Sequence, residues 1–198
     1  MSLGLTGVLA LTLLGGFCVK EREMDDVFDV LAEDHEDVRQ TLAELEKGPT
    51  AATGACEDRL MLRKMMTDEL IVEQFKHEEA ELACLWPAVR QYVAGGDELA
   101  DRGICDELEI FEIMPWLGRR DPADRDFEIL LAQYTRATRA HFDFEERYVW
   151  PRLGSVLPPR LAAELGHKVQ LGKQATPVPP LPSTWLSPGE NARYGSFG

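Results

Sequence analysis

Residues 77–87 read HEEAELACLWP, and residues 141–151 repeat the same template as HFDFEERYVWP. In each copy a glutamate stands four residues after the histidine, a tryptophan nine residues after it and a proline ten residues after it. A step of four residues on a helix places two side chains on one face, with Cβ atoms about 5–6 Å apart. Each His–Glu pair can therefore bind one metal ion or help to bridge two. We expect each Trp-Pro to close the core and end its helix.

A single His–Glu pair at this spacing is most simply an ion pair on a helix surface. Two copies, His77 with Glu81 and His141 with Glu145, favour metal binding instead. His35 lies on the apolar stripe of the first predicted helix, where the alternative is a core histidine bonded to a neighbour. Three of the four histidines are then expected to face the core from three helices. We predict a metal site made by these five residues.

Apolar residues recur at steps of three and four along most of the chain, which is typical of helices with one buried face. Glycine and proline separate these segments. The predicted helices cover residues 25–46, 57–93, 98–115, 122–149 and a short 160–168. Pro115 is expected to disrupt the third helix. The fold class is therefore predicted as all-α, an up-down four-helix bundle with a short C-terminal helix and a disordered Pro-rich tail.

The chain divides by composition into three parts. Residues 1–23 form an apolar extension, which is either a start assigned too early or a weak targeting segment. Residues 24–173 make up the predicted bundle, and residues 174–198 form a flexible Pro-rich tail. We expect a cytoplasmic protein, with the apolar extension as the one feature that argues otherwise.

Charge limits the classes of partner. The chain has 198 residues, with 21 Lys and Arg against 35 Asp and Glu, for a net charge of −14. This is the wrong sign for gripping nucleic acid or an anionic membrane, so neither is an expected partner. Carboxylates gathered inside a fold repel one another unless cations neutralise them, which keeps metal binding open.

The two repeated motifs, together with EDHEDV at residues 33–38, resemble the hemerythrin-like HHE cation-binding family over about residues 24–173. The resemblance implies two non-haem iron ions between the helices. It also implies that His35, His77, Glu81, His141 and Glu145 bind them, with the two glutamates as bridges. Imidazole and carboxylate ligands suit manganese or zinc as well.

The third predicted helix departs from the family pattern. Where the family has a histidine, the segment CDELEIFEIMPWL at residues 105–117 has none. Counting back from Leu117, as from Leu45 to His35, places Glu107 at that position. Glu109 and Glu112 are the fallback candidates, and an ordinary exposed acid is the alternative for Glu107.

Three functions follow from these expectations. The first is a protein that binds or reacts with O2, peroxide or NO, that is, a small diatomic or peroxide ligand. The second is an oxidoreductase that removes peroxide or oxidises ferrous iron, which a carboxylate-rich site would favour over reversible oxygen carriage. The third is a metal-free helical interaction module, which would leave buried polar groups without a balancing cation. Glu78, Glu79 and Glu146 are candidates for outer hydrogen-bond acceptors or proton carriers, and the oligomeric state stays open.

Overall fold

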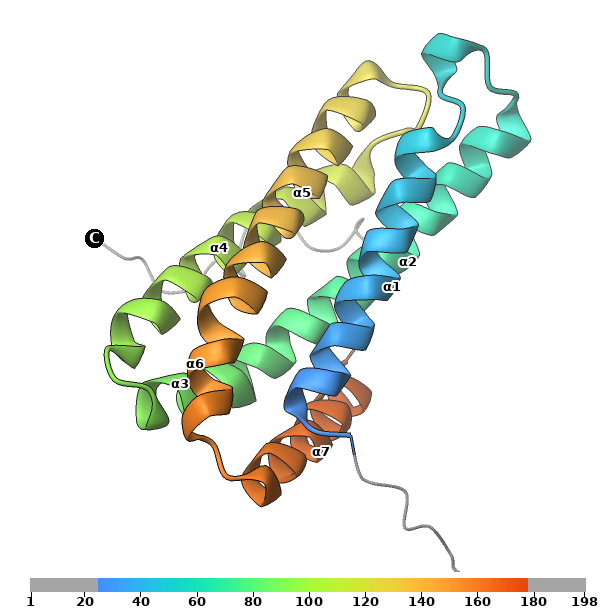
Figure 1. Cartoon of the computed structure of the whole chain (residues 1–198). Coiled ribbons are helices and arrows are strands. Elements are labelled where there is room, and N and C mark those ends of the chain that lie inside the picture. The colour runs from blue at the N-terminus through green and yellow to red at the C-terminus, as the bar shows by residue number, and fades with distance from the viewer. Residues whose placement is uncertain (1–24, 178–198) are drawn as a thin grey trace, which may run out of the picture.

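The computed structural model describes residues 25–177, which are helical with no strand, and so confirms the all-α fold. Four long helical columns make the bundle, and the C-terminal helix packs at one end of it (Figure 1). The helices are α1 (Val27–Lys47), α2 (Glu57–Ala80), α3 (Trp86–Tyr92), α4 (Gly96–Arg119), α5 (Arg125–Phe144), α6 (Trp150–Val156) and α7 (Pro159–Ala175). A short 3-10 turn, Ala51–Thr53, lies in the α1–α2 connection.

α1 begins at a well-formed cap. The Asp26 side chain accepts hydrogen bonds from the backbone N–H groups of Phe28 and Asp29, which satisfies donors that the first helical turn leaves open. The buried residues of α1 then recur at helical spacing: Val27, Val30, Leu31, His35, Val38, Leu42 and Leu45. His35 thus faces the core, as its position on the apolar stripe predicted.

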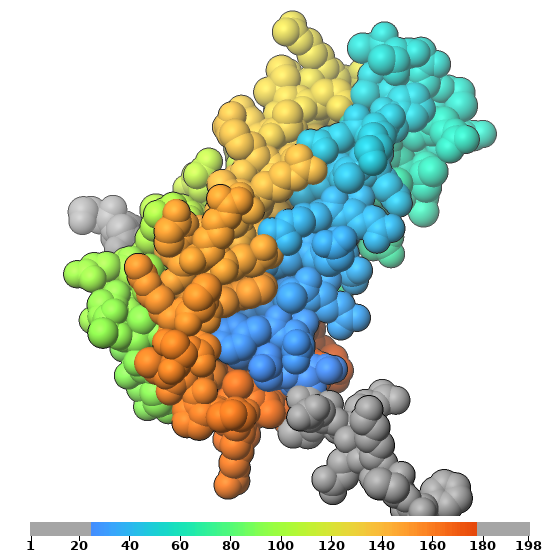
Figure 2. Space-filling model, viewed as in Figure 1, coloured from blue at the N-terminus to red at the C-terminus, as the bar shows by residue number. Residues whose placement is uncertain are grey.

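Two apolar clusters fill the bundle on either side of this histidine. One contains Val27, Leu31, Trp86 and Leu153 near the end where α7 packs, and the other contains Val38, Leu42, Met114 and Phe127 toward the opposite end. In the space-filling view the side chains of α1 lie against those of α5 and α6 along one face (Figure 2). The polar residues of the predicted site lie between the two clusters.

The second column consists of α2 and α3, and the fourth consists of α5 and α6. A π-helical turn joins the two helices of each column: η2 (Glu81–Leu85) in the second and η3 (Glu145–Val149) in the fourth. In η2 the Trp86 N–H donates to the carbonyl of Glu81, and in η3 the Trp150 N–H donates to that of Glu145. The expectation that each Trp-Pro ends its helix is wrong: helix continues past Pro87 to Tyr92, next to the predicted end at residue 93, and past Pro151 to Val156, beyond the predicted end at residue 149. Each proline lies in the first turn of the renewed helix, where a missing N–H is tolerated.

Two further expectations about helix ends are corrected. Pro115 lies inside α4, which continues to Arg119. Pro115 removes at most one backbone hydrogen bond from the last turns of α4. Met114 and Leu117, on either side of it, are fully buried, and their packing holds the helix in place. The short helix predicted at 160–168 is α7, and it runs to Ala175 into the stretch predicted as tail.

α7 packs against both α1 and α2. A Cβ atom on Gly166 would come within 2.7 Å of the backbone of Asp25 and Asp26, so only glycine permits this close approach. The predicted apolar extension at 1–23 and most of the tail predicted at 174–198 lie outside the described residues. None of the described helices combines the length and apolar character needed to cross a membrane.

Candidate metal centre

Seven buried ionisable side chains meet in the middle of the bundle and form two overlapping groups of candidate metal ligands. The histidine-rich group comprises His35, His77, Glu81 and Glu145. The carboxylate-rich group comprises Glu78, Glu81, Glu107 and His141. Within each group the potential ligand atoms lie within 4.8 Å of one another, and all seven residues are at most 1% exposed.

The two motif glutamates each direct one oxygen toward each group. Oε1 of Glu81 lies 3.3 Å from Nε2 of His77, and its Oε2 lies 3.6 Å from Nε2 of His141. Oε2 of Glu145 lies 3.2 Å from Nε2 of His35, and its Oε1 lies 3.6 Å from Nε2 of His141. The π turns begin at these same two residues, so the wider helical turn positions both carboxylates.

These separations suit atoms that share a metal ion. Two donor atoms at about 2.1 Å from one ion lie about 3.0–3.4 Å apart in octahedral or tetrahedral geometry. The histidine-rich group meets this range at its two closest pairs. In the carboxylate-rich group, Nε2 of His141 lies 3.3 Å from Oε2 of Glu78.

The same atoms lack hydrogen bonds. Within residues 25–177, no hydrogen-bond partner is found for Nε2 of the three histidines, for either oxygen of Glu81 and Glu145, or for Oε2 of Glu78 and Glu107. Buried polar atoms in this number would cost several kcal/mol if left uncompensated. Divalent or trivalent cations between the two groups would compensate them, so the residues present fit bound metal cations.

Electrostatic crowding appears in the pKa values of the site in its metal-free state. Burial, followed by the charge of Glu81, raises the pKa of Glu145 to about 7. Burial, together with Glu78 and Glu81, raises the pKa of Glu107 to about 10. Burial alone would lower the pKa of His77, but Glu81 and Asp34 raise it well above its ordinary value. Without a metal, bound protons must neutralise the buried carboxylates of the site.

Both histidines of the histidine-rich group are held from behind by carboxylates. Nδ1 of His77 donates to Asp34 over 3.0 Å, and Asp34 in turn accepts from Lys173 of α7. Nδ1 of His35 donates to Glu146 over 2.8 Å. This hydrogen bond, despite burial, lowers the pKa of Glu146 to about 2. Each contact fixes the tautomer that leaves Nε2 free to face the centre.

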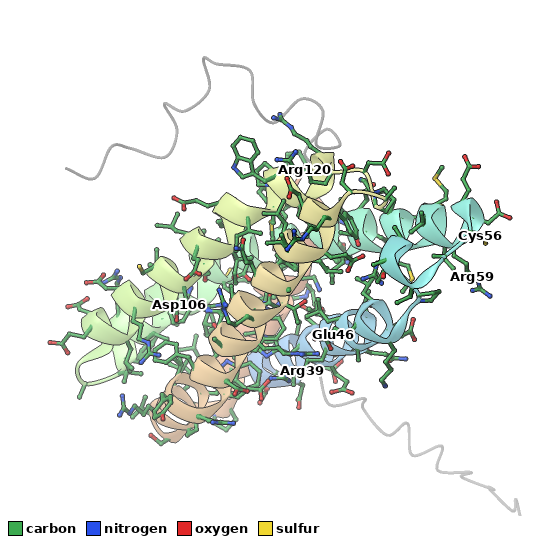
Figure 3. All side chains as sticks on the ribbon, turned by 90° about the horizontal axis from the view of Figure 1, so that it is seen from above. Arg39, Glu46, Cys56, Arg59, Asp106 and Arg120 are labelled. Atoms are coloured by element: carbon green, nitrogen blue, oxygen red, sulfur yellow. The ribbon has the colours of Figure 1, made fainter. Side chains whose placement is uncertain are left out.

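A second layer of ion pairs joins α1 to the fourth column. Nη1 of Arg39 lies 2.7 Å from Glu146, and Arg139 binds Glu46 over 2.8 Å further along α1. Arg39 and Glu46 are labelled where they leave α1 in Figure 3. Glu146, which contacts His35, therefore belongs to a network of ion pairs between α1 and the fourth column.

His141 has no equivalent support. Its Nδ1 lacks a hydrogen-bond partner among the described residues, although the imidazole is fully buried. Two carboxylates of this group accept hydrogen bonds from buried side chains: Gln74 Nε2 donates to Glu78, and Trp86 Nε1 donates to Glu107. The tryptophan of the first motif thus bonds a site carboxylate in addition to filling the core.

The structure brings together all six residues that the sequence singled out: His35, His77, Glu81, Glu107, His141 and Glu145. The fallback candidates Glu109 and Glu112 are exposed on α4. Glu146 contacts His35 as an outer acceptor, while Glu79 is half-buried and outside both groups.

Sequence reasoning placed Glu78 outside the ligand set, yet its carboxylate lies inside the carboxylate-rich group. It also missed the contact from Asp34 to His77 and the role of Lys173 behind it. Asp34 directly precedes His35 in EDHEDV, but nothing in that motif indicates that it reaches a histidine of another helix.

A family model described as the hemerythrin HHE cation binding domain matches residues 26–153 of this chain. Among solved structures, the chain is similar to a hemerythrin HHE cation binding domain-containing protein from Mycobacterium kansasii. The two share 21% sequence identity with a TM-score of 0.62, and the likeness covers 76% of this chain and 86% of the other. At that identity the likeness shows the fold alone. No curated protein matches the chain.

Proposed function

The chain belongs to the hemerythrin HHE cation-binding family, and from that premise we propose that it is a non-haem iron protein whose two ions react with O2, peroxide or NO. The observation that carries the proposal is the set of buried, mutually facing nitrogen and oxygen atoms that have no hydrogen-bond partner among the described residues. Family membership supports cations at this position, and iron is the part that we add.

In this proposal His35 and His77 would hold one ion, and His141, Glu78 and Glu107 would hold the other. Glu81 and Glu145 would each contribute to both ions, because each directs one oxygen to either group. Asp34 and Glu146 orient the two histidines of the first ion and increase the basicity of their imidazoles.

The iron pair would supply one-electron redox steps and open coordination positions for the small ligand. The protein itself contributes a buried, anionic set of ligands: three imidazoles and four carboxylates from four helical columns. The carboxylate-rich group has one imidazole against three carboxylates. Hard anionic ligands favour the ferric state, so we favour oxidative chemistry, such as peroxide removal or ferrous oxidation, over reversible oxygen carriage.

The first test is metal content by inductively coupled plasma mass spectrometry, with an absorption spectrum, on protein expressed in iron-supplemented medium. We expect about two irons per chain in the wild type and clearly less in His77→Ala. His167→Ala is the matched control, because His167 is exposed on α7 and outside both groups. Folded wild-type protein without metal would overturn the proposal and favour the helical interaction module.

A further inference from the structure

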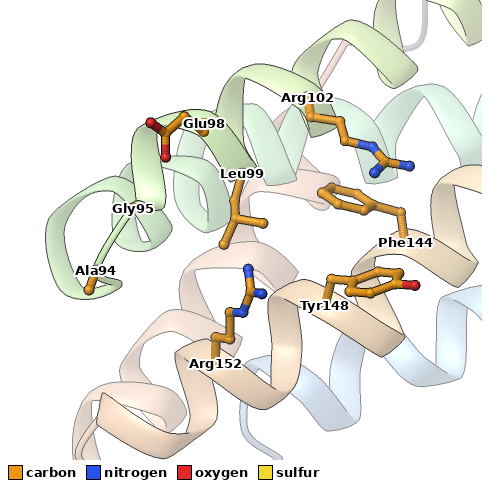
Figure 4. Close-up of a pocket in the computed structure, with 8 residues that line it drawn as sticks. All are labelled: Ala94, Gly95, Glu98, Leu99, Arg102, Phe144, Tyr148 and Arg152. Atoms are coloured by element: carbon orange, nitrogen blue, oxygen red, sulfur yellow. The ribbon is translucent and has the colours of Figure 1, made fainter.

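A separate hollow of about 590 Å³ opens on the surface beside the metal centre. It lies between the start of α4 and the junction of α5, η3 and α6 (Figure 4). Its volume is within the range of about 300–1,000 Å³ that is usual for small-molecule sites. None of the seven residues of the metal centre lines it.

One wall of the hollow is aromatic. Phe144 at the end of α5 and Tyr148 in η3 are neighbours on one helical face, with ring centroids 6.0 Å apart and an interplanar angle of 30°. Phe144 is 3% exposed and belongs to the core, whereas Tyr148 is 50% exposed. The phenol ring therefore offers an uncovered face on which a flat ring can stack.

Two guanidinium groups enter the hollow from different helices. Arg102 of α4 lies over the Phe144 ring, with Cζ 4.1 Å from the centroid, and Arg152 enters from α6 (Figure 4). The nearest carboxylate to Arg102 is Asp106, at 3.8 Å and only partly buried. Arg152 is exposed on α6, and the one carboxylate that lines the hollow with it is that of Glu98. Both guanidinium groups keep N–H donors available for an incoming anion.

The one carboxylate that lines the hollow is directed elsewhere. Glu98 lies in the first turn of α4, and its Oε2 would lie 3.2 Å from a Cβ atom added to Gly95. It therefore sits over the N-terminus of the helix, where a negative charge is favourable, and leaves the two arginines to set the charge of the hollow. In a chain of net charge −14, two arginines against one glutamate give this hollow a locally positive lining.

From this combination we propose that the hollow binds a mononucleotide-type ligand, in which a flat aromatic ring is joined to a phosphate. The ring stacks on Tyr148, and the phosphate accepts hydrogen bonds from Arg152 and Arg102. The ligand would lie against η3, the turn that begins with Glu145, so the site is next to the metal centre without sharing a residue with it.

The test uses flavin mononucleotide as the probe, with riboflavin as the matched ligand that lacks the phosphate. Full-length protein is titrated and the quenching of flavin fluorescence is followed. We expect saturable binding of flavin mononucleotide and at least about tenfold weaker binding of riboflavin, because charge-assisted hydrogen bonds to phosphate are among the strong ones. Equal binding of the two flavins, or no saturation with either, overturns the proposal.

Variants locate the site. Arg152→Ala and Tyr148→Ala should each weaken binding of flavin mononucleotide about tenfold, through the phosphate and the ring respectively. Arg147→Ala is the control, because Arg147 lies in the same turn but pairs with Asp143 and does not line the hollow. An unchanged affinity in both test variants, or an equal loss in the control, would contradict the assignment. Binding is measured with and without metal, so failure here leaves the iron proposal standing.

Discussion

The two halves of the metal centre, the histidine-rich group and the carboxylate-rich group, contain different proportions of imidazole and carboxylate ligands. In the histidine-rich group, two imidazoles are each held by a carboxylate behind them, and those carboxylates are themselves paired with Lys173 and Arg39. In the carboxylate-rich group, the single imidazole has an unsupported Nδ1, and two of the three carboxylates accept hydrogen bonds from the neutral side chains of Gln74 and Trp86. Outer contacts fix ligand geometry, whereas anionic charge sets the preference for oxidised metal. The comparison therefore predicts one half in which outer carboxylates set the orientation of the imidazoles, and one half whose ligands are more anionic.

The largest expected effect comes from removing Glu81, a residue that directs one oxygen to each half. Glu81→Ala should reduce iron from about two per chain to well under one, because both ions lose a ligand. Glu69→Ala, on the same helix and outside both groups, should retain the wild-type iron content. Full iron content in Glu81→Ala would show that the halves do not meet at this carboxylate.

A substitution confined to one half should separate the two ions. Glu107→Ala removes a ligand of the carboxylate-rich group alone, so we expect about one iron per chain and a changed ferric absorption spectrum. Glu109→Ala is the matched control, since this residue is on the same helix but on its exposed face. An unaltered spectrum in Glu107→Ala would remove Glu107 from the ligand set.

A milder change tests the outer support of the histidine-rich group. Asp34→Asn preserves size but removes the charge that holds His77 and Lys173. We expect metal affinity to fall about 10-fold with the bundle still folded, which is the usual scale for an outer carboxylate. Competition with a chelator measures the affinity, and Asp37→Asn, exposed on α1, gives the baseline. Equal affinities in the two variants would contradict the outer role of Asp34.

The smallest expected effect is a dependence of stability on pH. In the metal-free protein the pKa values of Glu145 and Glu107 are raised to about 7 and about 10, and those of His77 and His141 are also raised despite burial. The folded state then binds more protons than the unfolded state, so stability falls as pH rises from 6 to 9.

Thermal unfolding after chelation should therefore show a melting temperature lower by about 10 °C at pH 9 than at pH 6. In zinc-loaded protein the melting temperature should instead rise as the pH increases from 6 toward neutral, because a metal binds deprotonated ligands. A chelated protein that grows more stable toward pH 9 would mean that protons do not neutralise the centre.

Helical periodicity explains why much of the site could be predicted. A residue's position along a 3.6-residue repeat decides which way it faces, so His35 and the two His–Glu pairs were placed in the core by spacing alone. The same counting led to Glu107, although the proline in α4 obscured the pattern. Periodicity failed for Glu78, the immediate neighbour of His77, because two adjacent residues are not expected to face one centre.

The sequence by itself determined the helices, the buried stripe and the two repeated pairs, because these depend on local spacing along one chain. Only the tertiary structure decided that Glu78 joins the site, that Asp34 of α1 reaches His77 of α2, and that Lys173 of α7 completes the contact. It also decided the two π turns, in which the backbone bonds of Trp86 and Trp150 shift to the glutamate carbonyls. These features depend on how far apart the helices pack and how each is rotated, which is a balance of burial over the whole bundle that no single segment contains.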